Sequence, residues 1–273
     1  MKFLQALKEA IASLSANKTR SLLTVLGIVI GVGAVIGVLS IGQGAEASII
    51  GQIESIGTNV IYVYRGNSAK NVTNPRNLTL ADADALSNRV RAPHILNVAS
   101  VLFGQTSVRF GDESTQTSIM GVAENYAEVT DLDLSEGSFF TESNVTSRSS
   151  VVVVGPELAE RLTGRRTGII GTTVHINNYP FRVVGITTAK GGSQFSNPDL
   201  DVYIPITTMQ MRVQRQSDTN AVDFLLIQSQ DSQSIDLAIQ EAKSILRTTH
   251  RLTSRQPDDF TLTNQEDILS IAN

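Results

Sequence analysis

Histidines and carboxylates are the residues of this sequence best suited to acid–base or metal chemistry. The three histidines, His94, His175 and His250, lie far apart, and none is followed three or four residues later by a second His or a Glu. That spacing is what places two metal ligands on one helix face. We therefore predict no metal site.

The acidic residues do not form a convincing catalytic pair. The acids closest to such a pattern are Asp131, Asp133, Glu136, Asp199 and Asp201. A hydrolase that uses two carboxylates must hold them on either side of one bond. Acids at alternate positions beside predicted loops are typical of solvated side chains, so we predict no catalytic residues here.

The glycine-rich segments and the possible nucleophiles also fail to match known catalytic or nucleotide-binding motifs. The sequence has no cysteine, and Gly191-Gly192-Ser193 lacks the second flanking glycine of a nucleophile elbow. No Gly-x4-Gly-Lys-Ser/Thr loop is present, so we expect no nucleotide hydrolysis by that route. Gly31-x-Gly33-x-x-x-Gly37 has apolar flanks of membrane length, unlike a dinucleotide-binding turn. The sequence therefore predicts a chain without a cofactor that is not an enzyme.

Charge is distributed unevenly along the 273 residues, which carry 22 Lys and Arg against 26 Asp and Glu. The net charge of −4 argues against a nucleic-acid partner, which would need a basic face. Four basic residues, Lys2, Lys8, Lys18 and Arg20, and one acid precede Ser21, whereas 18 basic and 25 acidic residues follow it.

An uncharged run of 25 residues, from Ser21 to Ala45, follows the basic leader. About 20 helical residues span a hydrocarbon core of ~30 Å, so the run predicts a transmembrane helix. A buried core helix and a secretory signal are the alternatives, but signal cores are shorter, at about 7 to 15 residues. Basic residues stay on the cytoplasmic side, so we expect the N-terminus inside the cell membrane and the residues after about 46 outside.

Small residues recur along the predicted span as the pairs Gly27/Gly31 and Gly33/Gly37. Such pairs let a second helix backbone approach closely, although glycine is also simply tolerated in membrane helices. We interpret the pairs as helix-packing positions. We interpret residues 1–20 as an amphipathic helix at the cytoplasmic interface, anchored to lipid by Lys2, Lys8, Lys18 and Arg20.

The chain beyond the span predicts an α+β fold. Residues 21–56 form the span and a stalk, and two β-α-β units follow in residues 57–114 and 216–273, as a porter-like α/β subdomain. Thr79-x-x-Asp82 is an N-cap pattern for the first helix. The second helix is expected from about Ser234 to Leu252.

Residues 115–215 are expected to form an inserted, β-rich subdomain with many short strands. Asn177-Asn178 predicts a tight turn between two of these strands, and Pro156 predicts the first turn of a short helix.

Several segments together resemble MacB-type ABC transporter permeases of the FtsX-like superfamily. The resemblance covers essentially the whole chain, and the order and spacing of the segments carry it. They are Thr19-Arg-Ser-Leu-Leu-Thr-Val-Leu-Gly-Ile-Val-Ile-Gly31, Ile41-Gly-Gln-Gly-Ala45, Ile56-Gly-Thr-Asn-Val-Ile61, Met120-Gly-Val-Ala-Glu-Asn-Tyr126, Glu136-Gly-Ser-Phe-Phe140, Ile170-Gly-Thr-Thr-Val174, Pro180-Phe-Arg-Val-Val-Gly185, Asp201-Val-Tyr-Ile-Pro-Ile206 and Asp259-Phe-Thr-Leu262.

This resemblance implies a permease subunit of an export, efflux or mechanotransmission complex. Such permeases act as homodimers that convert ATP use by an ABC ATPase into movement of the outer domain, often with a membrane-fusion partner. No ATPase domain precedes Met1, which implies a separate ATPase subunit, and Asn273 lies where three further spans are expected. A single-span sensor or binding protein is the alternative, and a natural C-terminus near Asn273 would favour it.

Overall fold

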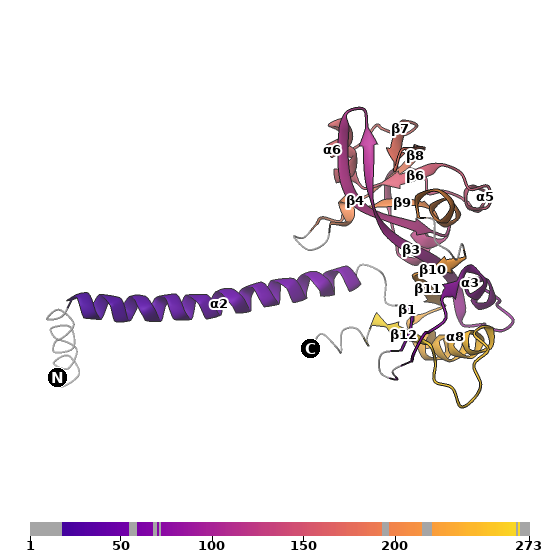
Figure 1. Ribbon diagram of the computed structural model, residues 1–273, viewed down its shortest axis with the longest axis horizontal. Helices are drawn as coiled ribbons and strands as arrows, with labels where there is room; N and C mark the ends of the chain where they lie inside the picture. Colours follow the sequence, from indigo (N-terminus) through magenta and orange to yellow (C-terminus); the bar gives the residue numbers. More distant parts are fainter. Residues whose placement is uncertain are drawn as a thin grey trace. The chain divides into compact units, whose positions relative to one another are not determined.

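The structure is a computed structural model of the 273-residue chain. It describes residues 18–54, 59–67, 70, 72–192, 197–214, 220–265 and 267. For residues 43–54 it describes the backbone alone. The chain divides into two units, residues 1–50 and 51–273 (Figure 1). We call the described residues from 59 onward the C-terminal domain.

The N-terminal unit contains one long helix, α2 (Lys18–Glu54). Its segment Lys18–Gly42 is long and apolar enough to cross a membrane, and the apolar side chains from Leu22 to Ile41 are exposed. At 1.5 Å per residue these 25 residues extend about 37 Å, more than the ~30 Å hydrocarbon core. Most of the predicted interfacial helix over residues 1–20, with Lys2 and Lys8, lies outside the described residues.

One half of the C-terminal domain places two helices on a four-stranded sheet segment. Its elements, in chain order, are β1 (Val60–Arg65), α3 (Leu80–Leu86), the first half of β3 (Ile95–Phe110), β11 (Phe224–Ser229), α8 (Ile235–Thr249) and β12 (Phe260–Asn264). The strand order is β12-β1-β11-β3, and every neighbouring pair is antiparallel. Each β-α-β unit is therefore split by a strand of the other unit.

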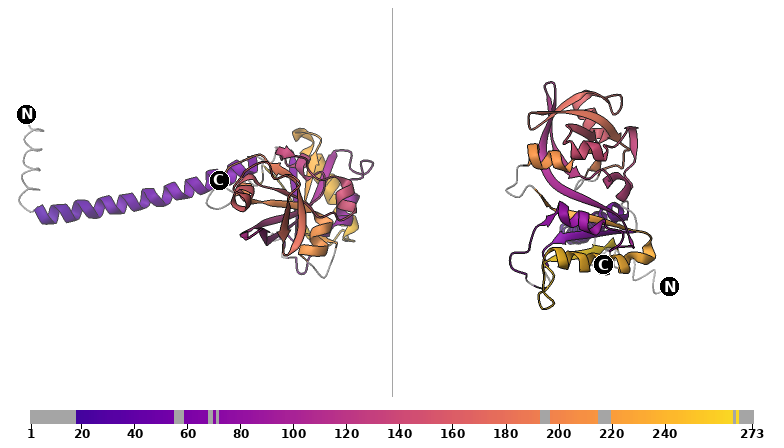
Figure 2. Two further views of the ribbon diagram at one scale, coloured as in Figure 1. Left: turned by 90° about the horizontal axis from the view of Figure 1, so that it is seen from above. Right: turned by 90° about the vertical axis from the view of Figure 1, so that its right-hand side faces the viewer.

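Strand β3 continues into the second half of the domain, where the strands close into a ring. The further strands are β4 (Glu113–Val122), β5 (Leu134–Gly137), β6 (Val151–Val154), β7 (Thr173–Ile176), β8 (Tyr179–Thr187) and β9 (Val202–Pro205). The sheet runs β3-β4-β9-β6-β8, and β7 pairs with both β8 and β3. The result is a mixed, barrel-like sheet, at the opposite end of the domain from α3 and α8 (Figures 1 and 2).

Short elements complete the domain. Strands β2 (Leu78–Thr79) and β10 (Ala221–Val222) pair with each other, and the short helices are α4 (Tyr126–Val129), α5 (Glu142–Thr146), α6 (Pro156–Thr163), η2 (Pro198–Leu200), α7 (Ile206–Thr208), η3 (Met209–Val213) and η4 (Ser232–Ser234).

Local sequence explains several of these boundaries. The Asp82 backbone N–H donates to Thr79 Oγ1 at 3.3 Å and the Thr79 N–H donates to Asp82 Oδ2 at 2.9 Å, which confirms the predicted cap of α3. Asn177 and Asn178 both have positive φ, at 47° and 68°, and form the predicted turn between β7 and β8. Pro156 opens α6, also as predicted.

Apolar side chains fill both faces of the continuous sheet. On one face, Ile61 and Val63 of β1 belong to the same buried cluster as Leu86 of α3 and Leu246 of α8. On the other face, Val60 belongs to a second cluster that includes Tyr203 and Phe140. Successive residues of a strand point to opposite faces, so β1 anchors both clusters.

Gly137, at the end of β5, illustrates how tightly the barrel packs. Its φ is 79°, and a Cβ there would meet the Val184 carbonyl oxygen. Gly111, in the β3–β4 turn, has a φ of 60° but open space around it. We expect Gly137→Ala to lower the free energy of unfolding by about 3 kcal/mol or more and Gly111→Ala by about 1 kcal/mol, because only the first adds overpacking to backbone strain.

Urea unfolding followed by tyrosine fluorescence measures both variants against the parent. Equal losses for the two alanines would contradict the close packing assigned to Gly137.

Candidate membrane and coupling surfaces

The helix-packing glycines of α2 have no neighbour within the described part of the chain. A Cβ built at Gly27, Gly31, Gly33 or Gly37 meets nothing within 4 Å. The pair Gly33/Gly37 is offset from Gly27/Gly31 by six positions, which places the two pairs on different sides of the helix. Their packing role therefore stays a prediction about a second helix.

The basic residues at the start of α2 are exposed. Lys18 and Arg20 lie in its first turn, and Thr24 Oγ1 donates to the Arg20 carbonyl oxygen at 2.8 Å. Their interfacial role also stays a prediction.

The entry of the chain into the sheet is held by a two-way hydrogen-bonded pair. Asn59 lies just before β1, its Nδ2 donates to the Ser229 carbonyl oxygen at 2.8 Å, and the Ser229 backbone N–H donates to the Asn59 carbonyl oxygen at 2.9 Å. Ser229 is fully buried. The first residue of the described domain after α2 is thus fastened to the end of β11.

Strand β1 lies in the interior of its sheet segment. It pairs with β11 from Val60 to Tyr64 and with β12 from Ile61 to Arg65. Ile61 pairs with Asn264, the last residue of β12, so the chain enters and leaves the sheet at adjacent points. A displacement of β1 would therefore move both neighbouring strands.

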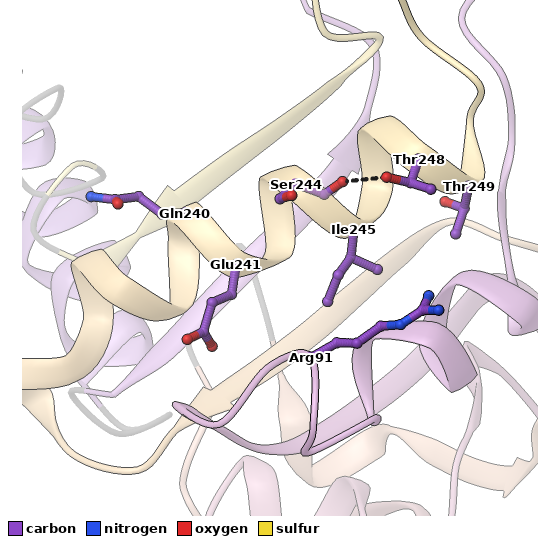
Figure 3. Close-up of a pocket in the computed structure, with 7 residues that line it drawn as sticks. All are labelled: Arg91, Gln240, Glu241, Ser244, Ile245, Thr248 and Thr249. Carbon is purple, nitrogen blue, oxygen red and sulfur yellow. Dashed lines mark hydrogen bonds between the residues drawn. The ribbon is translucent and has the colours of Figure 1, made fainter.

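A groove of about 590 Å³ lies between α8 and the segment after α3 (Figure 3). The residues that line it are Arg91, Gln240, Glu241, Ser244, Ile245, Thr248 and Thr249. The Glu241 carboxylate contacts His94 twice, at 2.6 Å from Nδ1 and at 3.1 Å from the backbone N–H. Glu241 therefore fastens α8 to the chain before β3, and we assign the groove no catalytic role.

A buried charged cluster joins the C-terminal end of α8 to α3 and β12. His250 is 5% exposed, and its Nδ1 lies 2.7 Å from Asp259 Oδ1 and its Nε2 3.6 Å from Asp82 Oδ2. Arg76 adds a positive charge beside them, because its backbone N–H donates to Asp259 Oδ2 at 3.1 Å and its Nη1 donates to the His250 carbonyl oxygen at 3.3 Å.

This cluster shifts the ionisation of its members. Burial alone would raise the pKa of Asp82, but His250, Thr249 and Thr79 outweigh it and lower that pKa to about 2. Burial alone would lower the pKa of His250, but Asp82 and Asp259 outweigh it and raise that pKa. A histidinium between two carboxylates is therefore the favoured state.

The sequence did not predict this cluster, because its three members are separated along the chain. Asp82 lies in the first turn of α3, His250 directly follows α8, and Asp259 directly precedes β12. In the sequence, the adjacent residues His250 and Arg251 indicate only the C-terminal end of a helix, where basic side chains are favoured.

Among the other candidate acids, Asp199 and Glu136 hold backbone segments of the barrel through hydrogen bonds. Asp199 accepts from the backbone N–H groups of Lys190 and Gly191 at 2.8 and 3.1 Å, and Glu136 accepts from that of Gly168 at 2.6 Å. Burial, and then the nearby Asp199, raise the pKa of Asp201 to about 7. Among the described residues, no group of three or more His, Asp or Glu side chains could hold a metal ion.

We expect the buried cluster to stabilise the domain most between about pH 4 and pH 6.5. A histidine with a raised folded pKa contributes stability below its unfolded value near 6.5 and loses it as the pH rises through the folded pKa. An aspartate with a lowered pKa contributes above about 3.8 and loses that contribution as the pH falls towards 2.

The substitution His250→Leu should cost about 3 to 5 kcal/mol in that window, since it leaves two buried carboxylates without their partner. Thermal unfolding from pH 3 to pH 9 measures the effect, with half-buried His175→Leu, outside the cluster, as the control. A cost for His250→Leu that does not change with pH would show that the cluster is not ionised as described.

The chain matches a known protein family over most of its length. Residues 21–245 match the model of the MacB-like periplasmic core domain. A macrolide export ATP-binding/permease protein MacB of Chlorobium luteolum is 32% identical over 263 residues, and a pyoverdine export ATP-binding/permease protein PvdT of Pseudomonas syringae pv. tomato is 29% identical over 266 residues. The alignments cover 94% and 96% of this chain but 38% of each relative.

Solved structures share the fold of the C-terminal domain. The periplasmic region of MacB from Actinobacillus actinomycetemcomitans has a TM-score of 0.65 at 23% identity and covers 80% of this chain and 94% of that one. The extracellular domain of the ABC-type transporter YknZ from Gram-positive bacteria has a TM-score of 0.62 at 21% identity and covers 76% and 100%.

The matched region is the non-catalytic periplasmic domain of these relatives, and this chain of 273 residues holds no ATPase domain. The chain thus combines a helix long and apolar enough to span a membrane with a domain homologous to a periplasmic one. It belongs to the MacB-like periplasmic core domain family.

Proposed function

We propose that this chain is the first span and the extracytoplasmic domain of an ABC-type permease. In this proposal, a separate cytoplasmic ATPase hydrolyses ATP, and the permease converts the energy into movement of the outer domain. The observation that carries the proposal is the direct succession, in one chain, of the apolar helix α2 and a MacB-like periplasmic core domain whose interior strand β1 follows it.

The charge pattern supports an orientation with the N-terminus in the cytoplasm. Lys2, Lys8, Lys18 and Arg20 precede the apolar segment, and basic residues close to a span stay on the cytoplasmic side. The C-terminal domain then lies outside the cell membrane. These four side chains contact anionic lipid headgroups at the inner interface.

The hydrogen bonds at the sheet entry support mechanical transmission. A pull on the chain before Asn59 reaches β11 through Ser229, and reaches β12 through the pairing of β1. Strands bonded on both sides shift together more easily than they separate, because separation exposes a whole row of backbone groups. We therefore assign the movement to the sheet as one body.

The family supports a homodimer in which α2 helices pack through Gly27/Gly31 or Gly33/Gly37. The open space around all four positions suits the close approach of a second helix. The helix-covered half of the C-terminal domain then serves as the porter-like α/β subdomain, and the barrel, from the second half of β3 onward, serves as the inserted β-rich subdomain. A membrane-fusion protein is the proposed outer partner.

A flexible insertion tests the transmission. A nanobody raised against the C-terminal domain reports on the state of that domain in the complete protein, which is co-expressed with a cognate ABC ATPase and placed in nanodiscs. If ATP shifts the outer domain, nanobody affinity differs between nucleotide-free and ATP-trapped complexes by about fivefold or more. A flexible Gly-Ser insertion after Gly57 should make the affinities for the two states equal. The flexible segment before β1 would no longer transmit the movement of α2 to the sheet.

The matched control places the same insertion after Gly111, in the open β3–β4 turn, where the affinity difference should persist. A complete protein that neither binds nor stimulates an ATPase would overturn the proposal and favour a membrane-anchored sensor.

A further inference from the structure

Basic side chains gather at one end of the C-terminal domain, although the chain as a whole is acidic. Residues 60–81 contain three basic and no acidic side chains, and residues 243–260 contain four basic and two acidic ones. The remaining residues beyond Ser21 contain 11 basic and 23 acidic side chains. The positive charge is thus concentrated in two short segments, one near the start of the domain's sequence and one near its end.

The fold brings these two segments together. The Gly66 backbone N–H donates to the Asp259 carbonyl oxygen at 2.7 Å, and Thr261 Oγ1 donates to the Gly66 carbonyl oxygen at 2.7 Å. Between them lies a groove of about 570 Å³. The residues that line it are Lys70, Lys243, Arg247, Ser254, Arg255, Gln256, Pro257 and Asp258.

The single carboxylate of the groove is already paired. Asp258 is 6% exposed, its Oδ1 accepts from Arg247 Nη1, and its Oδ2 lies 3.1 Å from Lys243 Nζ. Arg247 also donates to the carbonyl oxygens of Thr253 and Gln256, so its guanidinium shapes the wall of the groove. Asp258 therefore cannot neutralise the other cations.

Two cations in the groove remain available to a ligand. The side chains of Lys70 and Arg255 are exposed and make no hydrogen bond or ion pair with any residue that the structure describes. Lys243 is half exposed, and its ammonium group has three protons, so it can donate to a ligand as well as to Asp258. Ser254 adds a hydroxyl donor.

We propose that this groove binds a phosphate-bearing anion, held by Lys70, Arg255 and Lys243. A phosphate group near neutral pH has a charge of about −1.5 to −2 and acceptor oxygens on all sides, which suits separate cations around a concave site. A groove of this volume admits one or two phosphate groups. An acidic protein surface would instead need a broad, flat basic face.

The binding site does not depend on the transport proposal, because it rests on the C-terminal domain alone. The phosphate could come from a lipid headgroup or from a soluble phosphate compound, and the same groove chemistry serves both. The experiment therefore has one arm for each source.

The first arm titrates sodium pyrophosphate into the 273-residue chain in neutral detergent, by calorimetry at about 0.01 M ionic strength, where charges are weakly screened. The variant Lys70→Gln/Arg255→Gln should bind about tenfold more weakly or worse, because two charge-assisted hydrogen bonds are lost. The control variant Arg109→Gln/Arg165→Gln changes the net charge equally at exposed positions of the barrel and should bind like the parent.

The second arm uses the absence of native cysteine to attach one dye at Thr73→Cys, an exposed position three residues from Lys70 that does not line the groove. Dye response to phosphatidylglycerol nanodiscs, relative to phosphatidylcholine nanodiscs, that disappears in the Lys70→Gln/Arg255→Gln background assigns the site to lipid. Response to pyrophosphate alone assigns it to a soluble ligand. Absence of both responses, equal weakening by the control variant, or response to an acidic peptide but to neither phosphate source would overturn the proposal.

Discussion

The continuous hydrogen bonding of β3 is the constraint on which the rest of the C-terminal domain depends. Its first half pairs with β11 up to Val101, and its second half pairs with β4 from Val101 to Phe110. One strand therefore belongs to both the helix-covered layer and the barrel. A register slip of one residue would turn Ala99 and Val101 from one buried cluster towards the other, so packing on both faces fixes the register.

This continuity is the kind of stiffness that the proposed mechanical role would require. Helix α8 is tied to the rest of the domain at several points, by Glu241 to His94, by His250 to Asp82 and Asp259, and by Arg247 to Asp258. Burial opposes the ionised form of Asp258, but Arg247 and Lys243 outweigh it and lower its pKa. The buried charges of Asp82, His250, Asp258 and Asp259 are costly unless paired, so their pairs hold α3, α8 and the chain before β12 in one arrangement.

Sequence reasoning predicted the elements whose signals are local. The length of the apolar run predicted α2, Thr79 and Asp82 predicted the start of α3, and Asn177-Asn178 predicted the β7–β8 turn. Each signal lies in one continuous stretch of sequence, and the cap and turn signals lie within a few residues. The family resemblance, carried by segments along the whole chain, was also confirmed.

Features that depend on distant residues were not predictable in this way. The length of β3 is one example, because the polar run Gly104 to Ser107 carries no local strand signal, yet β3 continues to Phe110 through its pairing with β4. The expected start of the inserted subdomain at residue 115 falls inside β4. His250 and Asp82 meet only because α3 and α8 pack on one sheet face, a contact between segments 168 residues apart.

In the proposed permease, the C-terminal domain moves as one body when a separate ATPase subunit binds ATP. Spin labels test it directly, at Val90→Cys, which is 93% exposed beside the helix layer, and at Arg165→Cys on the barrel. Distances are measured in the complete transporter with and without trapped ATP. We predict an unchanged distance between the two labels of one copy and a shifted distance between the Val90 labels of two copies. An unchanged distance between copies, or a changed distance within one copy, would contradict the account.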